Sequence, residues 1–109
     1  MISLFILLLL VWIHFFADFI CQSDKMAQNK SKSIKWLSIH SLIYTLPFLL
    51  FGWKFSILNG LLHFGVDYTT SKINKQLWEN KEVHWFFVGI GADQAVHMTL
   101  LILTYIWLF

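Results

Sequence analysis

Residues 2–21 read ISLFILLLLVWIHFFADFIC, and this stretch decides the fold class. Fourteen of its first nineteen residues are Leu, Ile, Phe or Val. A helix needs about 20 predominantly apolar residues to cross a bilayer. A secretory signal peptide would add a basic start and a small-residue cleavage site, and this stretch has neither. We therefore expect residues 2–21 to form a retained transmembrane helix.

Three further apolar stretches follow. We expect membrane spans over residues 34–52, with a bend at Pro47, over residues 55–73, and over residues 92–109. Gly89 and Gly91 would separate the last span from an interfacial approach. The segments between the spans, residues 22–33 and 74–91, are predicted to be cytoplasmic loops. The expected fold is an all-α, integral membrane four-helix bundle that forms one domain, residues 1–109. A soluble helical bundle is the alternative, but soluble helices need a polar face, which the first and last spans lack.

Composition and charge agree with a membrane protein. Hydrophobic residues make up 58% of the chain and charged residues 13%, against roughly 25% charged residues in soluble domains. The basic residues are all Lys, and they concentrate in the two long loops, so the positive-inside rule places those loops in the cytoplasm and both termini outside. A net charge of +2 without a basic stripe argues against a nucleic-acid partner. A chain of this length is compatible with a homo-oligomer, although no interface motif is present.

Two segments of the sequence resemble each other. Residues 14–19 read HFFADF and residues 63–68 read HFGVDY, so both follow the pattern H-F-x-x-D-aromatic. The span after each carries one His soon after it enters the membrane, His40 and His97 respectively. We interpret the chain as two duplicated helical hairpins, related as a parallel repeat about the membrane normal.

The membrane spans contain a set of His and Asp residues that should face one another. Residues four apart share a helix face, so each H-x-x-x-D pair, and the reversed pair D-x-x-x-H at residues 93–97, points one way. Three buried carboxylates cost roughly 8–10 kcal/mol on insertion scales, and a favourable interaction must offset this cost. Imidazoles and carboxylates are common ligands of zinc, manganese and iron. The predicted ligands of one or two divalent transition-metal ions are His14, Asp18, His40, His63, Asp67, Asp93 and His97.

Other roles for this polar set remain open. His and Asp side chains inside a membrane also form proton or ion pathways, which would make the chain a conducting or membrane-permeabilising protein. They also act as interhelical hydrogen bonds, each worth under about 1–2 kcal/mol, as in a structural membrane subunit. Seven groups on four helices exceed what such bonds require, so we favour a metal site.

A metal site inside the membrane would suit hydrolysis. A divalent ion lowers the pKa of its bound water and so provides a nucleophile at neutral pH. Asp93 is the candidate general base. The lysines beside the two H-x-x-x-D motifs would favour an anionic lipid or a phosphoester at the cytoplasmic leaflet. The predicted function is therefore that of an intramembrane metal-binding protein and metal-dependent hydrolase.

The motifs together resemble a known family. The segment H-F-x-x-D-F-x-x-Q from His14 to Gln22, the lone His40, the pair His63–Asp67 and the segment D-Q-x-x-H from Asp93 to His97 are similar to the bacterial and phage-borne family catalogued as domain of unknown function 3307. The resemblance covers essentially the whole chain. It implies a small multi-pass protein of the bacterial inner membrane and offers no established activity. A looser likeness, limited to the H-x-x-x-D pairs, is to predicted membrane-bound metal-dependent hydrolases, and it supports metal binding by analogy.

Overall fold

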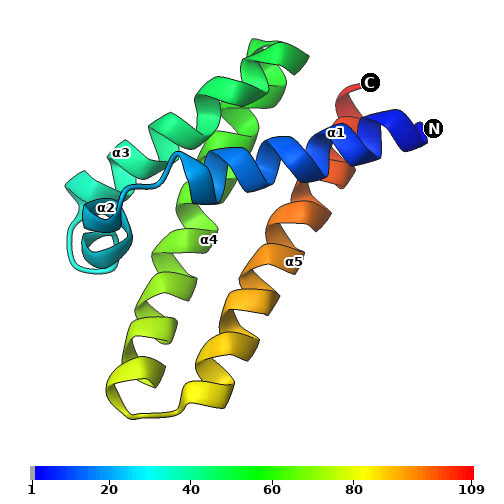
Figure 1. Cartoon of the computed structure of the whole chain (residues 1–109). Helices are drawn as coiled ribbons and strands as arrows, with labels where there is room; N and C mark the ends of the chain where they lie inside the picture. Colours follow the sequence, from blue (N-terminus) through cyan, green and yellow to red (C-terminus); the bar gives the residue numbers. More distant parts are fainter. Residues whose placement is uncertain (1) are drawn as a thin grey trace.

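A computed structural model describes residues 2–109, and all regular secondary structure in that range is helical (Figure 1). The elements are α1 (Leu4–Phe15), a π-helical turn η1 (Phe16–Ile20), α2 (Asp24–Asn29), α3 (Ile34–Thr45), a 3-10 helix η2 (Leu46–Phe51), α4 (Trp53–Glu79) and α5 (Val83–Leu108). The predicted all-α class is therefore confirmed.

The first apolar stretch is one helix that changes its pitch. Ser3 caps α1, since its hydroxyl accepts the backbone N–H of Ile6 at 3.2 Å. From Phe16 the winding widens to a π-turn, in which the Cys21 N–H donates to the Phe16 carbonyl at 2.9 Å. Single π-turns occur frequently at functional sites. This one carries the buried Asp18.

The second apolar stretch changes from an α-helix to a narrower 3-10 helix at the position where we expected a bend. The α-helical winding of α3 ends at Thr45, and η2 continues with Pro47 near its start. Proline lacks an N–H and clashes with the preceding turn, so a regular α-helix does not continue through it. Gly52 then joins η2 to α4 with a φ of 102°, a conformation that glycine adopts without steric cost.

The segment 74–91, which we predicted to be a loop, is mostly helical. Helix α4 continues to Glu79, and α5 begins at Val83 and runs through Gly89 and Gly91 without a break. The expected break is therefore wrong. A Cβ on Gly89 would lie 2.0 Å from the side-chain oxygen of Asn74. The glycine thus accommodates an Asn74 side chain from α4 instead of ending α5.

The other predicted loop, residues 22–33, also contains a helix. Ser23 caps α2 by accepting the Met26 N–H at 3.2 Å. Met26 is buried, which fixes the short helix against the bundle. Its residues therefore hold a defined position beside the longer helices, whereas the sequence had indicated only a connection.

Each long helical segment buries a stripe of residues three or four apart, together with a few of their neighbours. The stripes are Leu10, His14 and Asp18; His40, Tyr44 and Phe48; Phe55, Asn59, His63 and Asp67; and Asp93, His97, Leu101 and Thr104. Among the described residues, eleven buried side chains are polar or charged and eight are hydrophobic, while 29 large hydrophobic side chains are exposed. The molecule is thus more polar inside than a soluble protein is, and more apolar outside.

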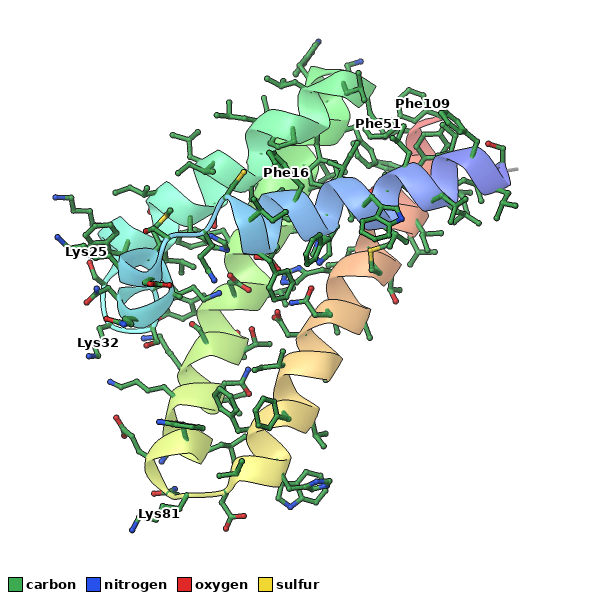
Figure 2. The ribbon with its side chains drawn as sticks, viewed as in Figure 1. Phe16, Lys25, Lys32, Phe51, Lys81 and Phe109 are labelled. Atoms are coloured by element: carbon green, nitrogen blue, oxygen red, sulfur yellow. The ribbon has the colours of Figure 1, made fainter. Side chains whose placement is uncertain are left out.

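The two ends of the molecule differ. Phe48, Phe51, Phe55, Tyr105 and Phe109 pack together, with Phe51 and Phe55 ring centroids 5.3 Å apart. Figure 1 shows the N- and C-termini at this end. Figure 2 shows the labelled lysines, Lys25, Lys32 and Lys81, toward the opposite side of the molecule. The buried His and Asp side chains lie between the two regions.

Two helical stretches, Ile34–Phe51 and Val83–Leu108, are long and apolar enough to cross a membrane. The apolar stretch Leu4–Ile20 is shorter. Helix α4 has the length, with 27 residues, but carries the most polar side chains. Two of the four expected spans thus correspond to helices that are long and apolar enough to cross a membrane, by length and composition alone.

We predict that two glycines of α4 respond oppositely to replacement by alanine. A Cβ on Gly60 would lie 2.0 Å from Thr45 Oγ1 and 3.2 Å from Thr45 Cβ, whereas Gly65 has no atom within 4 Å. Gly60→Ala should lower the free energy of unfolding by about 1–3 kcal/mol, because α3 must move away. Gly65→Ala should raise it by about 0.5–1 kcal/mol through helix propensity. Reversible unfolding in detergent micelles measures both, and an equal response would show that α3 and α4 are not in close contact at Gly60.

Candidate metal centre

The seven side chains predicted from the sequence are all buried in one region of the bundle. Helix α1 and its π-turn supply His14 and Asp18, α3 supplies His40, α4 supplies His63 and Asp67, and α5 supplies Asp93 and His97. The inward stripes place them at one level of the molecule. They divide into two groups that could hold a metal ion: Asp18, His40, His63 and Asp67; and Asp18, Asp93 and His97.

The first group is the more compact. His40 Nε2 lies 2.9 Å from Asp18 Oδ1, 3.2 Å from Asp67 Oδ2 and 3.0 Å from His63 Nε2. His63 Nε2 lies 3.2 Å from Asp67 Oδ2 and 3.6 Å from Asp18 Oδ1. Ligand atoms of a tetrahedral site with bonds of about 2.0–2.2 Å lie about 3.3–3.6 Å apart. The four atoms therefore have nearly the mutual spacing of a tetrahedral ligand set.

Hydrogen bonds alone do not satisfy this first group. A neutral imidazole carries one N–H, which points at one acceptor, yet each Nε2 faces two carboxylate oxygens and the other ring. Within residues 2–109, His40 Nδ1 and His63 Nδ1 have no hydrogen-bond partner. Both rings thus make their polar contacts through Nε2. A cation at the meeting point would interact favourably with all four atoms at once.

The second group shares carboxylates with the first. His97 Nε2 lies 3.2 Å from Asp93 Oδ1 and 3.2 Å from Asp67 Oδ1. Asp67 therefore presents Oδ2 to the first group and Oδ1 to His97. Asp18 likewise directs Oδ1 to His40, while its Oδ2 accepts from Gln94 Nε2 at 3.3 Å. Both carboxylates thus lie between the two groups.

The two halves of the chain make equivalent contacts. In the first half the His of the second helix meets the Asp of the first, His40 to Asp18 at 2.9 Å. In the second half the corresponding pair is His97 and Asp67, at 3.2 Å. The i,i+4 pairs are also equivalent, although His14 Nε2 and Asp18 Oδ2 are 3.8 Å apart across the π-turn. The local symmetry ends at Asp93, whose counterpart in the first half is Trp36.

His14 lies beside the two groups. Its Nδ1 is 2.9 Å from the Tyr44 hydroxyl, and its Nε2 contacts Gln94 Oε1. The amide nitrogen of Gln94 in turn donates to Asp93 Oδ2 at 3.1 Å. His14 and Gln94 thus connect the carboxylates into one hydrogen-bonded network.

Ring stacking fixes the imidazoles. Tyr44 stacks on His63 with ring centroids 3.8 Å apart, and His63 stacks on His97 at 4.3 Å. Because these rings are also buried, rotation about their side-chain bonds would require neighbouring helices to move. The Nε2 atoms are therefore held in place by packing.

The sequence did not single out two residues that touch the carboxylates. Lys30, which immediately follows α2, places Nζ 3.2 Å from Asp67 Oδ2, although a loop lysine was expected only to orient the chain. Thr70 donates to Asp93 Oδ1 at 2.6 Å. Its position three residues after Asp67 gave a weak signal for the same helix face. Gln94, the Gln of the D-Q-x-x-H segment, donates to both Asp18 and Asp93.

His84 lies apart from the buried histidines. It is exposed near the start of α5 and packs only its ring edge against Trp85, with centroids 5.3 Å apart. It lies outside both groups of potential ligands. His84 therefore provides a matched histidine control for the buried ones.

We predict that Tyr44→Phe weakens the network without disturbing the stack on His63. The substitution leaves His14 Nδ1 without its hydroxyl partner, and an unsatisfied buried polar group costs about 1–3 kcal/mol. Tyr68→Phe, at an exposed position, should change the free energy of unfolding by less than about 0.5 kcal/mol. Equal stabilities of the two variants in detergent would contradict the contact between Tyr44 and His14.

Comparison with known proteins gives a family and no activity. Residues 4–109 match the family model described as a protein of unknown function, DUF3307. No curated protein and no solved structure matches the chain. Because the match covers nearly the whole sequence, including all seven His and Asp positions, the chain belongs to the DUF3307 family.

Proposed function

We propose that this protein is an intramembrane metal-binding protein that acts as a metal-dependent hydrolase. One observation carries the proposal, the convergence of Asp18, His40, His63 and Asp67 on a single point. Two imidazole nitrogens 3.0 Å apart, with carboxylate oxygens at 2.9 to 3.6 Å, form an arrangement that one divalent cation stabilises. Neutral imidazole and carboxylate together suit zinc, manganese or iron.

The distribution of side chains supports a membrane environment with four spans. Large hydrophobic residues cover the outside and polar residues fill the inside, the reverse of what water favours. The longest dimension of the molecule is 43 Å, comparable to a bilayer of about 40–45 Å with its headgroups. In a bacterial inner membrane, the positive-inside rule would put the lysine-rich side in the cytoplasm and both termini outside.

Six side chains are assigned as ligands. Asp18, His40, His63 and Asp67 would hold one ion. Asp18, Asp93 and His97 would hold a second ion where two are bound. His14 is assigned a positioning role, since both of its nitrogens already have partners. The equivalent contacts of His40 and His97 support the duplicated-hairpin interpretation.

With one ion in the first group, Asp93 is free of metal and is the candidate general base. It accepts hydrogen bonds from Thr70 and Gln94 and also lines a cavity beside the cluster. A divalent ion bound here would supply an activated water molecule. Asp93 would accept a proton from the attacking water, and Thr70 would orient the Asp93 carboxylate toward it. The substrate would be an ester or phosphoester that reaches the cavity from the lysine-rich side.

Ion or proton conduction is the rival function. It would require a polar path from the cluster to both surfaces. On the side of the termini, the buried Phe48 and Phe55 lie beyond Tyr44 and Asn59, with Phe48 and Phe55 ring centroids 6.1 Å apart. This aromatic layer opposes a continuous path, so we favour metal binding.

We predict that protein purified in mild detergent, without a metal-chelating tag, contains about one or two equivalents of a transition metal. The double variant His63→Ala, His97→Ala should lose this metal, because each position loses an imidazole ligand. His84→Ala should retain it. Elemental analysis of the three proteins gives the result directly.

The metal-site proposal is wrong if the folded wild-type protein contains no metal, even after incubation with zinc, manganese and iron salts. Helical circular dichroism establishes that the protein is folded. Proton or ion flux through liposomes would then become the leading explanation for the buried groups.

We further predict that Asp93→Asn lowers kcat by about 10²- to 10⁴-fold against a chromogenic phosphoester, as expected for loss of a general base. The amide keeps the size of the side chain, so the first group should still bind metal. Glu82→Gln, at an exposed position before α5, should have no effect. If Asp93→Asn retains full turnover, the general base is another residue.

A further inference from the structure

A cavity of about 530 Å³ lies directly beside the metal centre. It is bounded by the end of η1, by α2 and its flanking residues, and by the half of the α4–α5 hairpin nearest the turn. The carboxylates Asp18, Asp67 and Asp93 are part of its lining. Its volume falls within the range of about 300–1,000 Å³ that is typical of small-molecule sites.

The cavity has a polar end and an apolar end. The carboxylates and Gln94 lie at one end, and Trp78, Phe86 and Phe87 lie toward the hairpin turn. At a rise of about 1.5 Å per helical residue, Trp78 is about 16 Å along α4 from Asp67. A ligand that fills the cavity must therefore be amphiphilic, with its polar group at the metal centre.

Two lysines line the cavity between these ends. Lys30 reaches into it with a side chain only 18% exposed and contacts Asp67. Lys75 lines it from α4, and its Nζ lies 3.8 Å from Oε1 of the exposed Glu79, an ion pair that a phosphate would replace. Neither Lys25 nor Lys72, the lysines nearest the sequence motifs, is part of the lining. Instead Lys25 lies over the Trp36 ring and Lys72 over the Tyr68 ring.

The charges of the lining make anion binding depend on the metal. Three carboxylates and two lysines leave one net negative charge, which repels an anion. One divalent ion held by these carboxylates would change this balance to one net positive charge, and it would compete with Lys30 for Asp67. The ammonium group of Lys30 would then be free to pair with a phosphate, which lysine binds as a point charge.

One amide oxygen points to a hydroxyl group on the ligand. Gln22 Oε1 belongs to a residue that lines the cavity. The atom is buried and has no hydrogen-bond partner within residues 2–109. A buried acceptor without a donor is unfavourable. A hydroxyl group beside a phosphate would satisfy it.

Building on the metal-centre function above, we propose that this cavity binds a single-chain phospholipid with a phosphate monoester on a hydroxyl-bearing head group. The phosphate lies between the metal centre and the ammonium groups of Lys30 and Lys75. A head-group hydroxyl faces Gln22, and the acyl chain packs against Trp78, Phe86 and Phe87.

The test uses full-length protein in nonionic detergent, saturated with zinc or manganese. The probe is a monoacylglycerol phosphate, compared with the monoacylglycerol of the same chain and with inorganic phosphate. Isothermal titration should show the phosphorylated lipid binding at least about tenfold more tightly than either control. A chelator should abolish this preference.

Matched variants locate the site. Lys30→Gln and Lys75→Gln should each weaken binding of the phosphorylated lipid by about three- to tenfold. Lys32→Gln and Lys72→Gln, whose side chains lie outside the lining, should change it by less than about twofold. Trp78→Ala should weaken lipid binding and leave the affinity for inorganic phosphate unchanged.

Metal content measured on the same samples distinguishes failure of the lipid-binding proposal from failure of the metal-centre proposal. If metal is bound but the neutral lipid binds equally well, or if Lys30→Gln and Lys75→Gln have no effect, the lipid phosphate proposal is wrong and the metal centre stands. If inorganic phosphate binds as tightly as the phosphorylated lipid, the acyl chain does not contribute to binding and the lipid assignment is wrong. A protein that binds no metal overturns both.

Discussion

The contact between Asp67 and the imidazoles of three different helices organises the rest of the structure. Its carboxylate lies 3.2 Å from the Nε2 atoms of His40, His63 and His97, and Lys30 adds a fourth nitrogen at the same distance. A carboxylate removed from water must be compensated where it lies, because an unpaired buried charge costs several kcal/mol. The positions of α3, α4 and α5 relative to one another therefore depend on the contacts of the Asp67 carboxylate.

Other features of the fold hold the side chains around Asp67 close together. Gly60 permits the close approach of α3 and α4, and the π-turn in the first helix carries Asp18 into the same cluster. Tyr44 stacks on His63 and bonds His14, so it joins the packing of the rings to the hydrogen-bonded network. Rigid side chains around potential ligands lower the cost of organising a metal site. Stability and the proposed chemistry thus have the same physical origin.

The side of the cluster toward the lysines differs from the side toward the termini. Aromatic rings close the side toward the termini, whereas the side toward the lysines leads into a cavity lined by both carboxylates and lysines. The apolar outer surface and the one-sided opening are consistent with an intramembrane centre that receives its ligand near one leaflet. The duplicated pattern of His and Asp accounts for the core of the cluster. Asp93 and Gln94, which occur only in the second half, make its open side asymmetric.

Much of this site follows from helical periodicity. An interval of four residues puts His63 and Asp67 on one face, and burial of a charge in an apolar segment requires that face to turn inward. The same reasoning placed His40 and His97 at similar depth. It could not place Lys30, because that side chain depends on the short helix α2. Nor could it assign Gly89 to a close helix contact, since the space around a glycine depends on the neighbouring helix.

The sequence by itself determined that the chain is helical, which faces of the helices are buried, and which His and Asp side chains share those faces. These properties depend on local periodicity and on the balance of polar and apolar residues. Only the tertiary structure decided that Asp18 and Asp67 lie between two groups of potential ligands, that His14 bonds Tyr44 and Gln94, and that a cavity opens beside the carboxylates. Those features depend on distances of a few ångströms between helices, which are set by side-chain packing across the bundle.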